Sequence, residues 1–503
     1  MAIVTRKSAF AVKVETTEGT PVSPTANTDY IPIQQDASMS PAVDTLTNDE
    51  LRASIGSSKS ILGAENPTAS VTTYLKASGV VGSAPDTGEL LKATFGDERI
   101  GATEYDTVAA STTSVVKVDA GEGTNFSRGR AVLVKHPASP YEIRSIESVS
   151  GDDLTLGFAL NNAPGTGVNL GQDVSYAPVS DGHQTLSLWH YLGNGGATQM
   201  ESGCRVTDFG IEFTAGELIT STYGIEGLEY FFNPIEITAT DIYVDFTDDD
   251  GTFAATVTAD FYKDPHELAA ALTTAMNNTA TTETHAVTYS DSTGKFTFAN
   301  TTGATLSLLW NTGTNTANTV GDKIGFSVAA DDTGATSYEG DNALSFASPQ
   351  SPSFDDSDPL AAKDNRVMIG DTANGTFCFP ASSVSFSLTN TRRSIDSICA
   401  ASARSGSIIQ SREVTVSVTA LLEQYDADQY RRFRENTDTK FEYNFGTKSG
   451  GNWVPGKCGS LFLPTATISS FNITDDDGLI TLEMELTAFV NSDGEGEAFL
   501  SFV

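Results

Sequence analysis

The first hundred residues constrain the fold most, because they are polar, interrupted by proline and too poor in apolar residues to form a core alone. They close on a short helix with clear end signals, expected within residues 85–96. An extended polar segment must find hydrogen-bond partners and apolar neighbours on another surface. We therefore predict an N-terminal arm laid across neighbouring copies of the chain, with residues 2–30 ordered only by those neighbours. The alternative, a disordered terminus, is disfavoured by the recurring apolar residues Tyr30, Ile31, Ile33, Ile55, Ile61 and Leu62.

The composition of the chain favours β-structure. Charged residues make up only 19% of the 503 residues, and Ser, Thr, Gly, Asn and Asp, which suit turns and exposed strand faces, take their place. The length exceeds one typical core, so two to four domains are expected. We predict a mainly β fold, with an antiparallel β-sandwich or barrel core, one packed helix, a small β-barrel insert and a small α+β insert.

Two changes in the local amino-acid composition and pattern set the predicted domain boundaries. Short β-rich runs separated by turns predict a small β-barrel insert over 103–180. A segment rich in Thr, Ala and Asn predicts an α+β insert over 238–342. The core, including the N-terminal arm, then comprises 1–102, 181–237 and 343–503. The barrel runs are 114–118, 130–134, 141–149 and 154–160, with 163–165 and 174–176 closing the barrel.

The α+β insert contains a helix with a recognisable start. Asp264 is predicted to cap it, with Pro265 at the first position and Glu267 at the third. A hairpin follows, with strands at 287–289 and 296–298. One face of the helix is apolar and is formed by Leu268, Leu272, Ala275 and Met276.

The C-terminal part returns to long alternating strands, around residues 384–388, 414–418 and 480–486. A single helix is predicted between Val418 and Phe441, with Tyr430 and Phe433 on its inner face. We expect this helix to pack over the antiparallel sheet.

The charge balance limits the partners of the chain. It carries 65 acidic and 29 basic residues, a net charge of −36. Nucleic-acid binding is driven by counterion release at basic contacts, so a surface this acidic disfavours it. No apolar run reaches the ~18 residues of a spanning helix, and residues 1–14 lack a secretory apolar core. We therefore expect no membrane partner and a chain made in the cytoplasm.

Two motifs come close to known sites, and each fails on a required residue. Residues 451–458 have a G-x-x-x-x-G-K frame, but it ends in Cys458 and continues as a strand, so a strand-joining turn is expected. The H-E-L-A-A run beginning at His266 lacks the second histidine of a zinc-binding helix, because Ala270 takes its place.

Two T-D-D-D-G runs suggest calcium at first sight. They contain residues 248–251 and 475–478. In a helix-loop-helix calcium site, Val257 and Met484 would stand where a bidentate carboxylate is required. Both runs are therefore predicted to be hairpin turns.

The remaining candidates show no ligand or catalytic pattern. Arg431, Arg432 and Arg434 are expected to pair with carboxylates across a subunit contact. We predict no catalytic, cofactor-binding or metal-binding residue, no cofactor and no enzyme activity. The four cysteines lack a C-x-x-C pair, so buried free thiols are expected at Cys204, Cys378, Cys399 and Cys458. The five histidines are not spaced as metal ligands or as parts of a catalytic motif; they are His136, His183, His190, His266 and His285.

Three strings in the N-terminal region carry a family resemblance. They are ETTEGTP (15–21), NDELRASIG (48–56) and APDTGELLKATFG (84–96). In this order, with an all-β remainder, they resemble the tail tube (major tail) proteins of long-tailed, non-contractile bacteriophages. The resemblance covers about the first hundred residues and, more faintly, 204–232 and 384–503.

The resemblance implies a structural virion protein that forms rings, hexameric in the family, stacked into a tail tube that conducts DNA into the host. The implied partners are further copies of the chain and other tail proteins such as the terminator, tape measure and tip proteins. DNA would pass through the lumen without specific binding. The protein would reside in the virion tail, and in the host cytoplasm during assembly.

In such a tube, the arm and long loops would lock one ring to the next and the two inserts would face outward. On charge grounds, the bore should be lined mainly by Asp, Glu, Ser, Thr and Asn, with Lys and Arg at subunit contacts or outside. Two other classes stay open: an extracellular or cell-surface β-domain adhesin with calcium-binding turns, and a carbohydrate-active enzyme whose acid pair is assembled in space.

Overall fold

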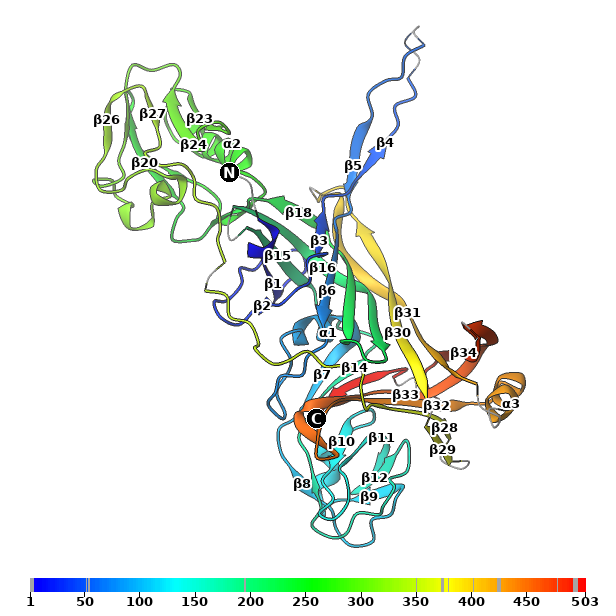
Figure 1. The fold of residues 1–503 in the computed structure, drawn as a ribbon. Helices are drawn as coiled ribbons and strands as arrows, with labels where there is room; N and C mark the ends of the chain where they lie inside the picture. Colours follow the sequence, from blue (N-terminus) through cyan, green and yellow to red (C-terminus); the bar gives the residue numbers. More distant parts are fainter. Residues whose placement is uncertain are drawn as a thin grey trace. The chain divides into compact units, whose positions relative to one another are not determined.

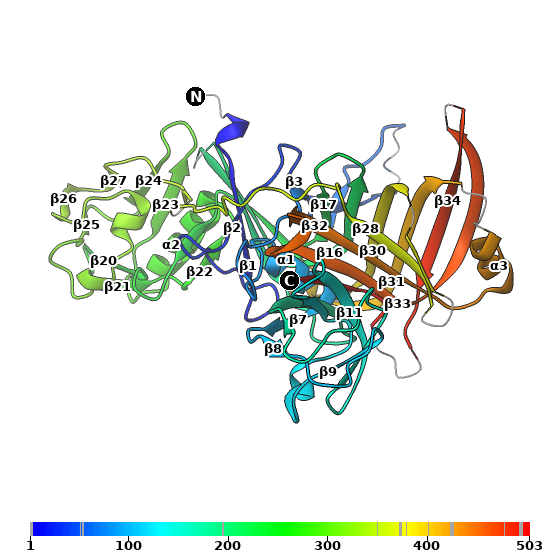
Figure 2. The same ribbon diagram turned by 60° about the horizontal axis from the view of Figure 1, so that its bottom comes forward.

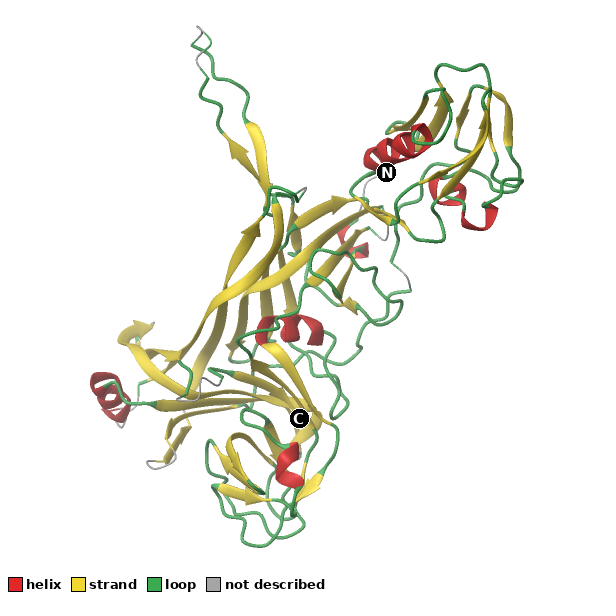
Figure 3. Cartoon of the chain, turned by 180° about the vertical axis from the view of Figure 1, so that it is seen from behind, coloured by secondary structure: helices red, strands yellow, loops and turns green. Residues whose placement is uncertain are grey.

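The computed structural model describes residues 4–50, 52, 55–193, 196–349, 351–371, 375–378, 380–400, 402–422, 427–476, 478–491 and 496–503. Strands account for 49% of the chain and helices for 9%, so the prediction of a mainly β fold is confirmed (Figure 3). Among the described residues, none of the helices has the length and apolar character needed to cross a membrane.

The chain divides into two compact units. The smaller comprises Met1–Phe10, Leu188–Glu201 and Glu229–Ser351, and the larger comprises Ala11–Ser187, Ser202–Leu228 and Pro352–Val503. Three strands have residues in both units, namely β1 (Ala9–Val14), β15 (Leu186–Leu192) and β16 (Ala197–Thr214). The boundaries predicted for the two inserts remain predictions.

The larger unit holds most of the strands and two of the helices (Figure 1). Its elements are β2 (Tyr30–Ile31), β3 (Ser38–Ser40), β4 (Val43–Leu46), β5 (Ile61–Glu65), β6 (Thr68–Tyr74), α1 (Gly88–Phe95), β7 (Gly96–Gly101), β8 (Tyr105–Asp106), β9 (Val115–Lys117), β10 (Ala131–Val134), β11 (Glu142–Ser150), β12 (Asp153–Leu156), β13 (Asn169–Leu170), β14 (Asp173–Pro178), β17 (Thr220–Glu226), β28 (Arg366–Asp371), β29 (Gly375–Cys378), β30 (Ala381–Asp396), β31 (Arg404–Leu421), α3 (Ala427–Glu435), β32 (Thr439–Ser449), β33 (Asn452–Asp476), β34 (Leu479–Ala488) and β35 (Phe499–Phe502).

The smaller unit is an α+β structure around an aromatic core. Its core includes Phe246, Phe296 and Trp310, all nearly inaccessible to solvent. Its elements are β18 (Glu229–Phe232), β19 (Ile235–Ile237), β20 (Tyr243–Asp248), β21 (Gly251–Thr256), β22 (Asp260–Tyr262), α2 (Pro265–Asn277), β23 (His285–Ser290), β24 (Lys295–Asn300), β25 (Leu306–Leu308), β26 (Asp332–Ala335) and β27 (Ser337–Glu339).

The start of α2 follows the predicted capping pattern. The Asp264 side chain accepts a hydrogen bond from the Glu267 backbone N–H at 2.9 Å, and Pro265 occupies the first turn. The apolar face of the helix is buried at Leu268, Leu272 and Met276. The predicted hairpin after the helix is formed by β23 and β24.

Six short strands of the larger unit form a small closed barrel. They pair in the order β8–β13–β10–β11–β12–β9, and a bridge between Thr107 and Val118 joins the two ends. Val116, Val132 and Leu156 belong to its buried core. Residues 174–176 do not close the barrel as expected, because β14 pairs instead with β7 and β35. The alternation of β14 is compatible with either sheet, and only long-range pairing decides between them.

The rest of the larger unit contains one sheet-and-helix motif twice. In the first motif the strands pair in the order β3–β6–β17–β16, and in the second in the order β30–β31–β34–β33. Each contains the succession strand, helix, strand: β6–α1–β7 and β31–α3–β32. Antiparallel pairing of β16 with β30 joins the two motifs into a row of eight strands, called the eight-stranded sheet below, which is part of a larger sheet of 18 strands.

The two helices cover the apolar face of this sheet at matching places. Phe95 of α1 packs edge-on against Phe209 of β16, with ring centroids 5.9 Å apart. Phe433 of α3 stacks on Phe471 of β33 with ring centroids 6.1 Å apart, as predicted for the inner face of that helix. Figure 2 shows α3 beside the β33–β34 hairpin. Leu486 belongs to the same buried side of the sheet. The helix predicted within residues 85–96 is α1, and Gly96 ends it in the left-handed conformation with φ 106°.

The N-terminal segment is only partly the arm that the sequence suggested. Ala11 and Val12 of β1 are 0% and 2% exposed, and β2 is buried. The Glu15 carboxylate accepts hydrogen bonds from the backbone N–H groups of Gly19 and Gly203. The prediction that residues 2–30 are ordered only by neighbouring copies is therefore wrong for these parts, which bury their apolar side chains within the chain itself.

Candidate functional surface

The eight-stranded sheet has one apolar face and one polar face, because side chains alternate along each strand. The apolar face is buried, as at Ile211, Phe386 and Val416. On the other face, small polar and acidic residues of neighbouring strands stand opposite one another in the strand register. We call this set the polar face, and it consists of Ser38, Ser40, Thr68, Ser70, Thr72, Thr220, Thr222, Gly224, Glu226, Asp208, Gly210, Glu212, Thr214, Ser383, Ser385, Ser387, Thr389, Glu413, Thr415, Ser417, Thr419, Glu483, Glu485, Thr487, Thr467, Ser470 and Asn472.

The polar face is uncharged except for carboxylates. None of the positions in this set carries Lys or Arg, but the same alternation along β30 continues through Thr391 to the exposed Arg393, just beyond the set. Hydroxyl groups hold some carboxylates in place across the junction of the two motifs: Ser385 Oγ donates to Glu212 Oε1 at 2.6 Å, and Thr389 Oγ1 donates to Asp208 Oδ1 at 3.2 Å. At one end, the mostly buried Arg392 pairs with Glu226 at 3.2 Å. The positions of the set can therefore repel anions, and the cations next to it, Arg392 and Arg393, lie at one end of β30.

The sheet that carries the polar face has two open edges. Among the described strand pairings, β3 at one end pairs with β6, and residues 467–476 of β33 at the other end pair with β34. Each edge presents backbone groups that a further strand can pair with. Proteins remove such edges by covering them, by closing a barrel or by pairing with another chain.

A separate hairpin exposes apolar side chains. Strands β4 and β5 pair with each other as a two-stranded sheet and extend beyond β3 and β6 (Figure 1). Leu46, Ile61 and Leu62 are 55%, 59% and 70% exposed. An isolated two-stranded hairpin is marginally stable in water, and burial of these side chains against another surface would stabilise it. It lies in the N-terminal region where an arm was predicted, and contact of that arm with neighbouring copies remains a prediction.

Two long hairpins also end in exposed apolar residues. At the β33–β34 turn, Ile473, Leu479 and Ile480 are all more than half exposed. Near the β30–β31 turn, Ile395 and Ile408 are about half exposed. Apolar residues gathered at the ends of extended hairpins are typical of contacts with another molecule.

The glycine frame and the two T-D-D-D-G runs begin or lie at hairpin turns, as predicted, and the H-E-L-A-A run lies on α2. Gly450 and Gly451 form the tight connection between β32 and β33, and the chain continues as a strand past Cys458. Asp248 pairs with Gly251 across the β20–β21 turn. Asp476 pairs with Leu479 across the β33–β34 turn.

Two of the three arginines of α3 have a partner within the helix. Arg431 lies 3.9 Å from Glu435, and Arg434 lies 2.8 Å from the same carboxylate. Arg432 is 2% exposed. The prediction that these residues pair across a subunit contact remains a prediction.

The cysteines differ in exposure. Cys204 and Cys458 are buried thiols, and burial raises the pKa of Cys458 to about 12. Cys399 is exposed, in contrast to the expectation, because it lies in the connection between β30 and β31. The side chain of Cys378 lies outside the described residues.

One of the five histidines, His285, comes close to two carboxylates. It lies beside Asp248 and Glu283, and burial lowers the pKa of its imidazole. Sequence spacing could not indicate this group, because Asp248 belongs to β20 and His285 to β23. His266, by contrast, lies on the surface, 3.1 Å from Asp291.

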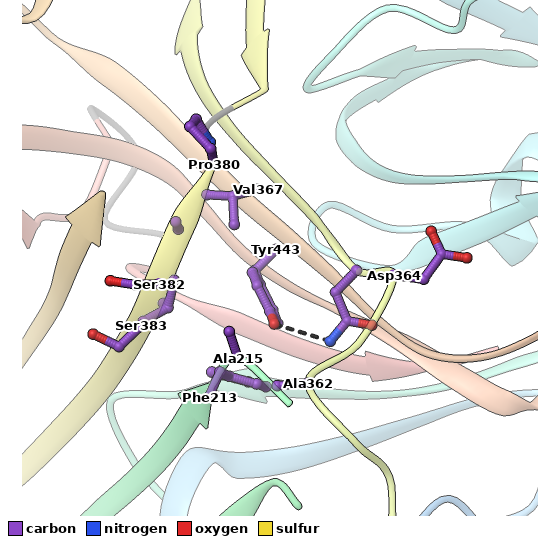
Figure 4. A pocket seen from close by; sticks show the side chains of 12 residues that line it. Phe213, Ala215, Ala362, Asp364, Val367, Pro380, Ser382, Ser383 and Tyr443 are labelled. Carbon is purple, nitrogen blue, oxygen red and sulfur yellow. Dashed lines mark hydrogen bonds between the residues drawn. The ribbon is translucent and has the colours of Figure 1, made fainter. Parts of the chain in front are cut away.

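A shallow cavity in the larger unit offers no reactive group that stands out. Its volume is about 250 Å³, its lining includes Asn365, and Figure 4 shows Tyr443 at its centre. The Asn365 amide donates to the Tyr443 hydroxyl at 2.9 Å, and burial raises the pKa of that phenol to about 12. Asp364 at the rim is paired with Lys448. These polar groups already have partners, and the prediction of no enzyme activity stays a prediction.

A buried carboxyl group, that of Glu442, joins the barrel to the neighbouring strands of the larger unit. Glu442 of β32 is fully buried, and its Oε1 accepts from the Ser145 backbone N–H at 3.1 Å and the Ser460 hydroxyl at 3.2 Å. Burial raises the pKa of Glu442 to about 7, although the nearby Arg144 opposes the shift. This arrangement is structural, because it lies away from solvent.

The chain has no match among protein-family models or curated protein sequences. Among solved structures, the SPP1 tail tube, determined by solid-state NMR and cryo-electron microscopy, is 16% identical over 28% of this chain and 76% of that chain. The TM-score is 0.20. A value this low carries no argument, so the proposal below rests on the residues of the chain.

Proposed function

We propose that this chain is a structural virion protein whose copies close into rings and stack into a tail tube that conducts DNA. The polar face carries the proposal: a broad sheet surface with hydroxyls and carboxylates and without lysine or arginine at its positions. DNA phosphates meeting such a wall find no cation to bind, so the polymer can slide past it. At 0.15 M salt, repulsion from the wall reaches about one Debye length, ~8 Å.

Ring closure would use the two open edges of the sheet. Edge-to-edge pairing of β33 in one copy with the β3–β6 edge of the next would extend the sheet and satisfy the exposed backbone groups. The polar faces of successive copies would then line one continuous inner surface. The apolar faces would remain covered, as α1 and α3 cover them in each chain.

The number of chains in a ring follows from the repeated motif. The family resemblance implies six subunits, each with one sheet and one helix, whereas this chain contains that motif twice. Three chains would supply the six motifs, and the ring would have a mass of about 159 kDa, three times the 53.0 kDa of one chain. Six chains would give twice that mass.

The exposed hairpins would connect successive rings. The β4–β5 hairpin presents Leu46, Ile61 and Leu62 for burial against the next ring. The two inserts would face outward. Terminator, tape measure and tip proteins would contact the ends and the lumen of the tube, and the protein would reside in the virion tail without an enzymatic role.

Electron microscopy and native mass measurement of the purified chain test this proposal. We expect rings or tubes built from units of about 159 kDa, with the polar face toward the lumen. Monodisperse monomers at every concentration and salt would contradict it. Calcium-dependent binding to cell surfaces by such monomers would instead support the adhesin alternative.

A hairpin replacement separates stacking from folding. Residues 43–65 can be replaced by a short Gly/Ser linker, because the Asn66 backbone N–H donates to the Ala42 carbonyl at 2.7 Å and the two ends are already adjacent. We expect rings that no longer stack, with an unchanged circular dichroism spectrum.

Single substitutions give a matched comparison for the same hairpin. Leu62→Asp should weaken stacking, whereas Phe232→Asp, at an exposed apolar position outside the hairpin, should leave it unchanged. Normal tubes from both the linker variant and Leu62→Asp would show that the β4–β5 hairpin does not connect rings.

A further inference from the structure

The smaller unit brings three metal-ligating side chains together. Asp248 is the last residue of β20, His285 is the first residue of β23, and Glu283 lies just ahead of it. One ligand atom from each residue lies within 4.8 Å of the others. Neighbouring acidic residues alone would not indicate a site, because exposed carboxylates often gather at turns.

The buried imidazole of His285 points to a ligand. Its side chain is 1% exposed, and neither ring nitrogen has a hydrogen-bond partner among the described residues. The Asp248 side chain is 0% exposed. Native proteins rarely leave a buried polar atom unsatisfied, and such an atom in a structure calls for an ion, a water or another explanation.

The distance between the two buried groups fits a shared metal ion. His285 Nε2 lies 3.5 Å from Asp248 Oδ2 without forming a hydrogen bond. Metal–ligand bonds of about 2.0–2.2 Å at tetrahedral angles place two donor atoms roughly 3.4 Å apart. Glu283 is half-buried, so its carboxylate can adjust to complete the set from the solvent side.

Surrounding groups already orient the ligands. The Thr281 hydroxyl donates to Asp248 Oδ2 at 2.6 Å, and the Asn300 amide donates to Glu283 Oε2. Asn277 at the end of α2 fixes the His285 backbone by accepting from its N–H at 2.8 Å. Outer groups of this kind hold metal ligands in position and strengthen binding.

We propose that Asp248, Glu283 and His285 bind one divalent transition-metal cation, with Zn²⁺ as the ion to test. An imidazole ligand favours zinc and its neighbours over calcium or magnesium, which prefer oxygen donors alone. Three protein ligands leave a fourth position for water. The ion would join the β20–β21 and β23–β24 hairpins of the smaller unit. This departs from the absence of metal ligands expected from the sequence.

The test is zinc binding by the full-length chain after removal of metal with EDTA. Isothermal titration with ZnCl2 should show one strong site per chain, and zinc should raise the Tm. Cobalt in place of zinc should give the visible absorption of a tetrahedral site. These readouts do not depend on ring formation, so their failure would leave the proposed tube function untouched.

Substitutions locate the site. His285→Ala and Glu283→Gln should each weaken zinc affinity at least tenfold. His266→Ala, which removes an exposed histidine beside Asp291, should leave it unchanged. Glu283→Gln changes a half-buried residue and keeps the proposal testable if His285→Ala does not fold. The absence of a strong zinc site, or zinc affinity unchanged in Glu283→Gln, would refute the proposal and leave an ordinary histidine–carboxylate pair.

Discussion

Substitution of Glu442 by glutamine should change how stability depends on pH. Burial raises the pKa of this carboxyl from 4.5 to about 7. The folded chain therefore holds the Glu442 proton more tightly than the unfolded chain does. The contribution to the unfolding free energy is fully present below pH 4.5 and is lost as the pH rises through about 7.

The size of the effect follows from the pKa difference. Each pKa unit corresponds to 1.36 kcal/mol, so the wild-type chain should lose roughly 3 kcal/mol of unfolding free energy from this residue between acidic pH and pH 8. Glu442→Gln does not titrate and should lack this loss. The difference between the introduced amide and the protonated carboxyl is a pH-independent offset, which cancels when the two pH values are compared.

The assay is urea unfolding followed by circular dichroism at pH 5 and pH 8. The wild-type stability should fall more steeply than that of Glu442→Gln over this range. Glu483→Gln, at an exposed carboxylate of the polar face, is the control for loss of one negative charge. Parallel pH dependence in the wild-type chain and Glu442→Gln would refute the reasoning.

Three further outcomes are expected. Phe209→Ala removes a side chain that is 1% exposed and packs on three aromatic rings, so urea unfolding should show a loss of about 3–5 kcal/mol of unfolding free energy. Thr222→Ala on the polar face should lower the unfolding free energy much less. Gly123→Ala should lower the Tm measured by calorimetry, because a Cβ there overlaps a backbone oxygen of the barrel. Glu413→Lys combined with Glu485→Lys should create DNA binding at low salt, and the logarithm of the binding constant should fall with the logarithm of the salt concentration by about 0.9 for each new phosphate contact. Unchanged DNA retention in a filter assay would contradict the role given to the polar face.

Local features of this fold were readable from the sequence. The cap at Asp264 and the turn at Gly251 depend on residues close together in the chain, so their chemistry indicates the structure directly. The same holds for the two faces of each strand, because a period of two residues assigns alternate side chains to opposite sides. The sequence of a strand such as β31 therefore indicates that one of its sides is polar, whichever strands pair with it.

The pairing of distant strands was decided by the tertiary structure alone. Ser385 and Glu212 are 173 positions apart, yet they share a hydrogen bond on the polar face because β16 pairs with β30. An alternating strand fits many partners equally well, so its pattern does not identify the one it chooses. The burial of β1 and the grouping of His285 with Asp248 have the same origin. The sequence by itself determined which side of each strand is polar. Only the folded chain decided which of these polar sides form one surface, because strand pairing depends on contacts between residues far apart in the chain.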